Sequence, residues 1–178
     1  MNYKQLMWEY HHYRFGLAGE GQADIIQGYL ERDRGQVLNI GCGPSGDKID
    51  AMAPHCNSLF AADLHCPASA RSEGASDNVA FLNADAGNLP ITDTSIDHIV
   101  ALGLFVWIEN PANVLSEFYR VCRTGGLVML TNAVRHPIDK YIELSTNAGF
   151  RLIEKHSGYC PAASGTVKER YLLVLAKR

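Results

Sequence analysis

The chain has 178 residues, a net charge of −3 and 47% hydrophobic residues, which suits one domain with one core. It has no long cluster of Lys and Arg, so an extended nucleic-acid surface is not expected. It also has no apolar run of membrane-spanning length and no signal-peptide core. The five cysteines are scattered without a CxxC pair, so we expect reduced thiols, no structural metal and a cytoplasmic protein.

The first predicted elements are two helices joined by a glycine hinge. Residues 2–15 place apolar side chains near one helix face, residues 16–21 form the hinge, and residues 22–32 form the second helix. His11 and His12 lie in the first helix. Adjacent helical residues point about 100° apart, so at most one of these histidines is expected to face a site. A solvated helix face is the alternative.

An apolar run over 37–40, a predicted buried strand, ends in a glycine-rich turn that begins with Gly41 and Gly43. Glycine adopts backbone angles that a side chain forbids, and it lets a ligand lie against the main chain. Helical character over 47–55 then directs unpaired N–H groups back at the turn. Such a turn serves several nucleotide cofactors, and a purely structural turn is the alternative.

Two further apolar runs end in carboxylates. The run over 58–63 ends in Asp63, which lies 63 − 41 = 22 positions after the first glycine of the turn. A doubly wound sheet places such an acid where it accepts both hydroxyls of a ribose. The run over 79–85 ends in Asp85. Surface carboxylates at strand ends are the alternative for both residues.

The rest of the chain continues the alternation of strands and helices, which predicts a parallel sheet covered on both faces. Asp93 and Asp97 are expected to shape the turn before the fourth strand. A helix, a strand and a returning terminal strand predict an antiparallel finish. The predicted elements are a strand over 98–105, a helix over 111–122, a strand over 127–130, a helix over 139–148, a strand over 150–155, a loop over 156–167 and a strand over 169–177.

Three motifs occur in a diagnostic order: the glycine turn, the stretch Asp85-Ala86-Gly87-Asn88-Leu89-Pro90, and Gly125-Gly126 after a helix. In this order they resemble the class I S-adenosylmethionine-dependent methyltransferases, especially the small-molecule, type 11-like branch. The resemblance covers about residues 36–130. It implies an α/β fold with a doubly wound Rossmann-like sheet, mostly parallel with an antiparallel C-terminal strand. It also implies S-adenosyl-L-methionine as the cofactor.

The same resemblance implies roles for individual residues. The turn Gly41-Cys42-Gly43 lies under the methionine part of the cofactor, and Asp63 binds the ribose hydroxyls. Asp85 holds the adenine amino group while the backbone N–H of Ala86 meets the ring, which matches the donor and acceptor edge of adenine. The other implied cofactor contacts are Asn39, Leu64 and Leu102.

The chain departs from the family pattern at several places, and two of them bear on the site. Asn39 stands where the family usually has Asp or Glu, so an acceptor is kept and a charge is lost. Val106 stands where the family often has His, so no general base comes from that position.

Related enzymes fold an N-terminal helix over the cofactor. We therefore expect residues 1–21 to form a lid helix and hinge within a single domain 1–178, with His11 or His12 as a catalytic base. The fourth-strand region lacks a [D/N]-P-P-[Y/F] signature, which favours a small-molecule acceptor with oxygen, nitrogen and carbon targets open. The expected acceptor contacts are Tyr13, Trp107 and His136.

Three classes of function remain open from the sequence. The leading one is a methyltransferase that acts on a small metabolite. The second is a methyltransferase-like binding protein or subunit without methyl transfer, motivated by Asn39 and Val106. The third is a nicotinamide-dependent oxidoreductase, which the glycine turn and Asp63 favour and the later motifs disfavour. A homo-oligomer, or a partner subunit that covers the site, is also left open.

Overall fold

The computed structural model describes residues 20–43, 47–66, 76–132, 137–161 and 167–178. The strands are β1 (Gln36–Ile40), β2 (Ser58–Asp63), β3 (Val79–Asn83), β4 (Ile96–Leu102), β5 (Cys122–Asn132), β6 (Phe150–Pro161) and β7 (Val167–Lys177). The α-helices are α2 (Glu20–Arg32), α3 (Asp47–Met52), α4 (Pro111–Val121) and α5 (Ile138–Asn147). Two short 3-10 helices are η1 (Ala53–His55) and η3 (Leu104–Val106).

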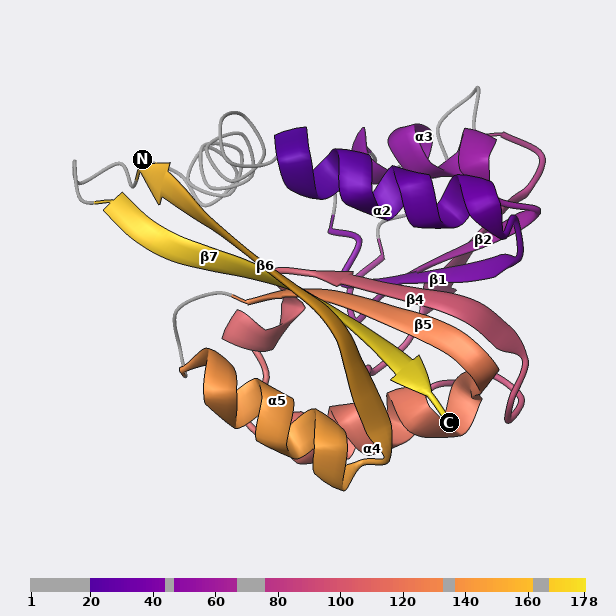
Figure 1. Cartoon of the computed structure of the whole chain (residues 1–178). Helices are drawn as coiled ribbons and strands as arrows, with labels where there is room; N and C mark the ends of the chain where they lie inside the picture. Colours follow the sequence, from indigo (N-terminus) through magenta and orange to yellow (C-terminus); the bar gives the residue numbers. More distant parts are fainter. Residues whose placement is uncertain (1–19, 44–46, 67–75, 133–136, 162–166) are drawn as a thin grey trace.

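All seven strands form one sheet in the order β3-β2-β1-β4-β5-β7-β6. The neighbouring pairs among β1 to β5 are parallel, whereas β7 is antiparallel to both β5 and β6. Helices α2 and α3 cover one face of the sheet, and α4 and α5 cover the other (Figure 1). The predicted doubly wound α/β sheet with an antiparallel finish is therefore confirmed.

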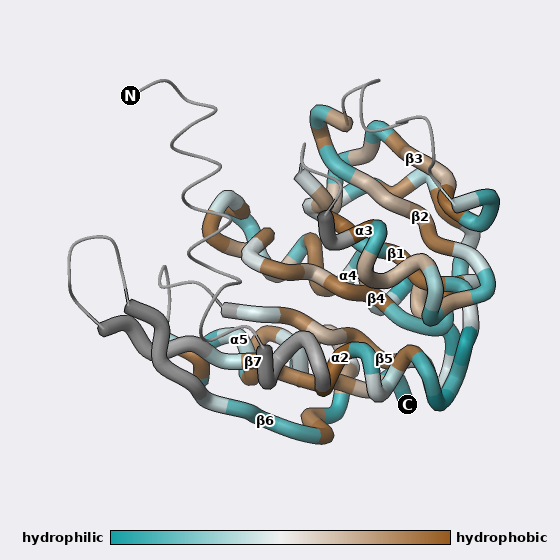
Figure 2. Tube along the Cα trace, turned by 90° about the horizontal axis from the view of Figure 1, so that it is seen from above, coloured by the Kyte–Doolittle hydropathy of each residue, from teal (hydrophilic) through white to brown (hydrophobic). Residues whose placement is uncertain are grey.

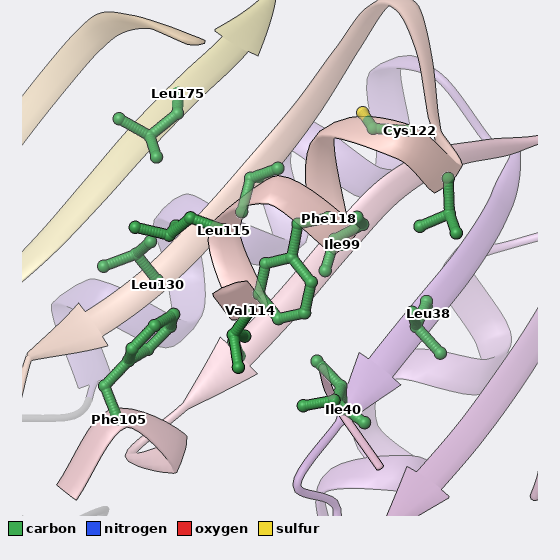
Figure 3. Packing of buried hydrophobic residues seen from close by; sticks show 14 of the residues in the cluster. Leu38, Ile40, Ile99, Phe105, Val114, Leu115, Phe118, Cys122, Leu130 and Leu175 are labelled. Carbon is green, nitrogen blue, oxygen red and sulfur yellow. The ribbon is translucent and has the colours of Figure 1, made fainter. Parts of the chain in front are cut away.

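Alternating side chains of β1 contribute to a core on each face of the sheet. Leu38 and Ile40 pack in the cluster that includes α4, while Val37 belongs to the cluster on the α2 and α3 side. Figure 3 shows Phe118 and Leu115 of α4 among the buried side chains of β1, β4 and β5. The hydrophobic stretches of the chain lie along these inner strands (Figure 2). Both faces are thus filled, and the ends of the strands are left for a ligand.

Several element boundaries differ from the sequence-based predictions, among them β5, which spans Cys122–Asn132 rather than 127–130. Helix α2 begins at Glu20 rather than at residue 22. The fourth strand ends at Leu102 because Gly103 adopts a left-handed φ of 72°, and a 3-10 turn follows. The loop predicted over 156–167 is wrong for 156–161, because these residues pair with β7 as far as Pro161 opposite Val167. None of the helices in the described part of the chain has the length and hydropathy needed to cross a membrane.

Candidate cofactor-binding site

The turn after β1 is held in shape by the backbone angles of its glycines and by hydrogen bonds to β2. Gly41 and Gly43 have φ values of 77° and 69°, a region that favours glycine. The N–H groups of Gly41 and Cys42 both donate to the carbonyl oxygen of Ala62 on β2, at 2.8 and 3.2 Å. A Cβ atom on Gly41 would lie 3.0 Å from Cδ1 of Leu104. The turn is therefore pressed between the ends of two neighbouring strands and needs glycine at its first position.

Asp63, the last residue of β2, connects the glycine turn to the turn that follows β2. Its Oδ2 accepts a hydrogen bond from the N–H of Gly43 at 3.0 Å, and its Oδ1 accepts one from the N–H of His65 at 3.1 Å. The side chain is half-buried. A carboxylate has about four lone-pair sites, so each oxygen keeps capacity for another donor. Two vicinal hydroxyls are donors that this remaining capacity would suit.

Asn39 lies one layer below the turn, between Ala61 of β2 and Val100 of β4 in the sheet register. The residue is fully buried, and neither its Oδ1 nor its Nδ2 has a hydrogen-bond partner among the residues that the structure describes. An unsatisfied buried polar group costs about 1–3 kcal/mol, which a ligand or water that reaches it would offset. These apolar neighbours also favour a neutral amide here, because an unpaired carboxylate would cost more to bury.

The turn after β3 carries the second predicted acid. Oδ1 of Asp85 accepts a hydrogen bond from the N–H of Gly87 at 2.8 Å, and the Asp85 carbonyl accepts one from Asn88 N–H at 2.9 Å. Asp85 is exposed, whereas the side chain of Ala86 is buried. Leu64, the residue after Asp63, is an apolar side chain that is 61% exposed. The apolar side chain of Leu64 thus follows β2, and the carboxylate of Asp85 follows the adjacent strand β3. This pair suits a flat ring that has polar groups at its edge.

The end of β4 closes the other side of this edge. Gly103 N–H donates to the Oγ1 of Thr131 on β5 at 2.9 Å, directly after Leu102. Phe105 is buried and makes edge-to-face contacts with Phe118 and Tyr141, so it is a core residue. Trp107, two residues later, is 59% exposed. Only the second aromatic side chain is therefore presented at the surface near the strand ends.

The structure brings all nine predicted cofactor residues to one edge of the sheet. They lie at or just beyond the carboxyl ends of four neighbouring strands, β3, β2, β1 and β4. The residues gathered there are Asn39, Gly41, Cys42, Gly43, Asp63, Leu64, Asp85, Ala86 and Leu102. The predicted residues His11, His12, Tyr13 and His136 lie outside the described residues.

Cys56 and Cys122 are buried thiols without a disulfide. Burial raises the pKa of Cys122 to about 12, so this thiol is protonated at neutral pH and is a poor nucleophile. Within the described ranges, no group of three His, Cys, Asp or Glu side chains gathers as a metal site would require.

Sequence reasoning missed the polar side chains that hold the Asp85 turn from outside. These are Asn113, Glu117 and Arg120 of α4, which bond to the segment after Asp85. Their signal was present as the stretch Leu115-Ser116-Glu117-Phe118-Tyr119-Arg120, but its spacing alone does not say which loop it contacts.

The strand order and the helices on both faces are those of the class I methyltransferase fold. Residues 38–130 match the model of the methyltransferase domain family, type 11. The chain belongs to this family.

The chain spans less than half the length of the first curated relatives that it matches. The chain is 30% identical over 128 residues to the methyltransferase GfsG of Streptomyces halstedii, which covers 66% of this chain and 45% of GfsG. It is 32% identical over 95 residues to a malonyl-[acyl-carrier protein] O-methyltransferase of Hamiltonella defensa, covering 53% and 36%. The fold is similar to that of an S-adenosylmethionine dependent methyltransferase from Mesorhizobium loti, with a TM-score of 0.72 at 13% identity over 89% of this chain and 99% of that one.

Proposed function

We propose that this chain transfers the methyl group of S-adenosylmethionine to a small-molecule acceptor. The observation that carries the proposal is the set of groups at adjacent strand ends: a positive-φ glycine turn, Asp63 beside it and Asp85 on the next turn. One ligand with a charged tail, a ribose and an amino-substituted ring uses all three. A ligand without the ring amine leaves Asp85 unused.

In this proposal each group meets one part of the cofactor. The backbone of the glycine turn lies under the methionine part, Asp63 accepts the ribose hydroxyls, and Asp85 with the N–H of Ala86 meets the adenine edge. Leu64 and Leu102 flank the ring and the centre of the ligand. These roles suit the observed exposure of Leu64 and the unused lone pairs of Asp63.

Asn39 supplies the most direct sign that a polar ligand group belongs under the turn. Its two amide atoms are buried without partners in the described part of the chain, and Asn39 lies on β1 two residues before Gly41. We assign them to the methionine end, where the amide oxygen accepts from an ammonium directly or through a water.

The cofactor supplies a methyl group on a sulfonium, which is a good leaving group. The protein therefore has to hold the acceptor in line and to exclude water. We assign these tasks to a lid formed by the residues before α2, with His11 or His12 as the base for an acceptor that loses a proton. Acceptor contacts are assigned to Tyr13, Trp107 and His136. Reduced thiols in the core agree with a cytoplasmic setting.

A binding protein that keeps the fold without methyl transfer is the second candidate. It is favoured by the neutral Asn39 and by Val106, which leave this edge with one charge and one imidazole fewer than the usual pattern. The fold alone does not separate the two candidates, and turnover does.

Two measurements test the proposal. Calorimetry with S-adenosylhomocysteine and NADH side by side should show binding of the first and not of the second, and the reverse would make the chain a nicotinamide enzyme. Incubation with methyl-labelled S-adenosylmethionine and a small-molecule cell extract should then label compounds in that extract. The Asp63→Ala variant, which should bind the cofactor weakly, is the control that should leave the extract unlabelled. If the wild-type protein binds the cofactor but labels no compound, the binding protein is favoured.

A further inference from the structure

Helix α4 has two faces of opposite character. Its apolar face is buried in the core through Val114, Leu115, Phe118 and Val121. A polar stripe runs along the helix at the i, i+4 and i+7 positions, which share one side of a helix. The stripe consists of Asn113, Glu117 and Arg120.

Each member of the stripe bonds to the backbone of the chain that follows Asp85. Nδ2 of Asn113 donates to the carbonyl of Gly87 at 3.1 Å, and Oε1 of Glu117 accepts from the N–H of Leu89 at 2.7 Å. Arg120 donates to the carbonyl of Leu89 at 3.0 Å and to that of Ile91 at 2.9 Å. Helix α4 thus bonds to the backbone of every second residue in this segment, Gly87, Leu89 and Ile91. Because only backbone atoms of the segment take part, these contacts do not depend on its side chains.

Glu117 and Arg120 also hold one another. Nε and Nη2 of Arg120 donate to the two carboxylate oxygens of Glu117 at 2.8 and 2.6 Å, and a further ion pair joins Arg120 to Asp93. The side chain of Glu117 is only 13% exposed. Hydrogen bonds from Arg120 lower the pKa of Glu117, which therefore stays ionised at neutral pH. A paired fork of this kind fixes both side chains in one geometry.

The loop in turn caps the helix. The N–H groups of Thr94 and Ser95 donate to the carbonyls of Arg120 and Val121, both at 2.9 Å. Carbonyls in the last turn of a helix lack partners within the helix, so these bonds satisfy them. The segment from Gly87 to Ser95 is therefore attached to α4 along the length of the helix.

We propose that this stripe is a positioning device that sets recognition of the adenine amino group, a role that rests on the proposed function. Asp85 is exposed, and its recorded contacts are with Gly87 and Asn88 of its own turn. The position of the Asp85 carboxylate therefore depends on where Gly87 and Leu89 are held. Displacement of a recognition group by about 1 Å is enough to lose most of its effect.

A pair of ligands tests this role. S-adenosylhomocysteine presents an amino group to Asp85, whereas its inosyl counterpart presents a carbonyl that a carboxylate repels. We expect the wild-type protein to prefer the adenosyl ligand by at least about tenfold, since hydrogen bonds to charged groups are the strong ones. The ratio of the two dissociation constants, measured by calorimetry, reports the Asp85 turn alone.

Three variants loosen the stripe by different amounts: Asn113→Ala, Glu117→Gln and Arg120→Lys. Lysine cannot reach two carbonyls and a carboxylate together, so Arg120→Lys should weaken adenosyl binding about five- to tenfold and change inosyl binding less than twofold. Asn113→Ala removes one exposed contact and should show a smaller shift in a protein that folds normally. Glu143→Gln is the matched control, because it breaks an i, i+3 ion pair with Lys140 on α5.

The outcomes separate the two proposals. A fall in the adenosyl preference in the stripe variants, with no change in Glu143→Gln, supports positioning by α4. Equal losses for both ligands, or an unchanged ratio in folded Asn113→Ala and Arg120→Lys, would overturn it and leave the stripe as a stability element. Failure of the wild-type protein to bind S-adenosylhomocysteine would overturn the proposed function, and this inference with it.

Discussion

The two turns that face the candidate site are held by different means. The Gly41 to Gly43 turn is fixed by positive φ angles and by N–H bonds to the Ala62 carbonyl. The Asp85 turn has a side chain that bonds within the turn, and its backbone is fixed from outside by the polar stripe of α4. The first turn depends on its own glycines and on the end of strand β2, where Asp63 follows Gly43 by 20 residues. The second depends on helix α4, where Asn113 and Glu117 follow Gly87 and Leu89 by 26 and 28 residues.

This difference decides how each turn responds to change. A substitution of a glycine in the first turn should change the geometry of that turn directly, because its backbone angles require residues without a Cβ atom. The Asp85 turn should instead respond to changes in α4 that leave its own residues intact. The following predictions test this division, from the largest expected effect to the smallest.

Phe118→Ala should have the largest effect, because it removes the anchor of α4. Phe118 is fully buried and packs edge-to-face on Phe105. Truncation of a buried Phe costs about 3–5 kcal/mol of the free energy of unfolding, measured by urea denaturation. Hydrogen exchange should also speed up at Leu89 more than at Gly41. Equal acceleration of exchange at Leu89 and Gly41 would contradict the idea that the two turns are held by different parts of the fold. Phe118→Leu is the milder control.

Asp63→Ala should weaken binding of S-adenosylhomocysteine at least about tenfold, because the loss of charge-assisted bonds is worth about 1.5–3 kcal/mol. The variant also releases Gly43 N–H and His65 N–H, so the glycine turn loosens. Asp63→Asn keeps one acceptor and should lose less. Unchanged calorimetric affinity in Asp63→Ala would remove Asp63 from the site.

Gly41→Ala should strain the glycine turn alone. A φ of 77° costs a residue with a Cβ about 1–2 kcal/mol, and the new atom would press on Leu104. We expect a lower free energy of unfolding and weaker binding of both ligands. The ratio of the adenosyl and inosyl dissociation constants should stay unchanged. A change in that preference would mean that the two turns are coupled.

The smallest expected effect is a pH dependence that belongs to the α4 stripe. The bonds from Arg120 lower the folded-state pKa of Glu117, so its stabilising contribution is present above the ordinary value of 4.5. That contribution is lost as the pH falls through the lower folded-state pKa. The advantage of the wild type over Glu117→Gln, about 1 kcal/mol or less at pH 7, should therefore shrink in urea unfolding between pH 5 and pH 3. A constant difference over this range would show that the charge of Glu117 does not matter.

The sequence predicted the sheet and the meeting of Gly41, Asp63 and Asp85 at one edge of it, because the signals for both are local. Apolar runs ended in Gly41, Asp63 and Asp85, and parallel strands bring such ends to one edge. It could not predict which loop Arg120 would contact, since that depends on how a helix lies across the sheet. The continuation of β6 was missed for the same reason, because pairing with β7 overrides the local pattern of residues 156–161.

Asp93 and Asp97 show the same limit. Both were expected to shape the turn before β4, yet Asp97 lies within β4, where it accepts a hydrogen bond from Gln36 N–H at 2.6 Å and pairs with Arg123. Asp93 does lie in the turn before β4, as expected, and it also pairs with Arg120. A turn-forming residue type between two predicted elements is thus compatible with a long-range ion pair, and only the fold distinguishes the two.

The most direct test of the account is a crystal structure of the protein with S-adenosylhomocysteine. The account predicts the ribose hydroxyls on the Asp63 carboxylate and the adenine amino group on Asp85, with the methionine end over Gly41 to Gly43. A ligand bound elsewhere, or an adenine amino group with no contact to Asp85, would contradict it.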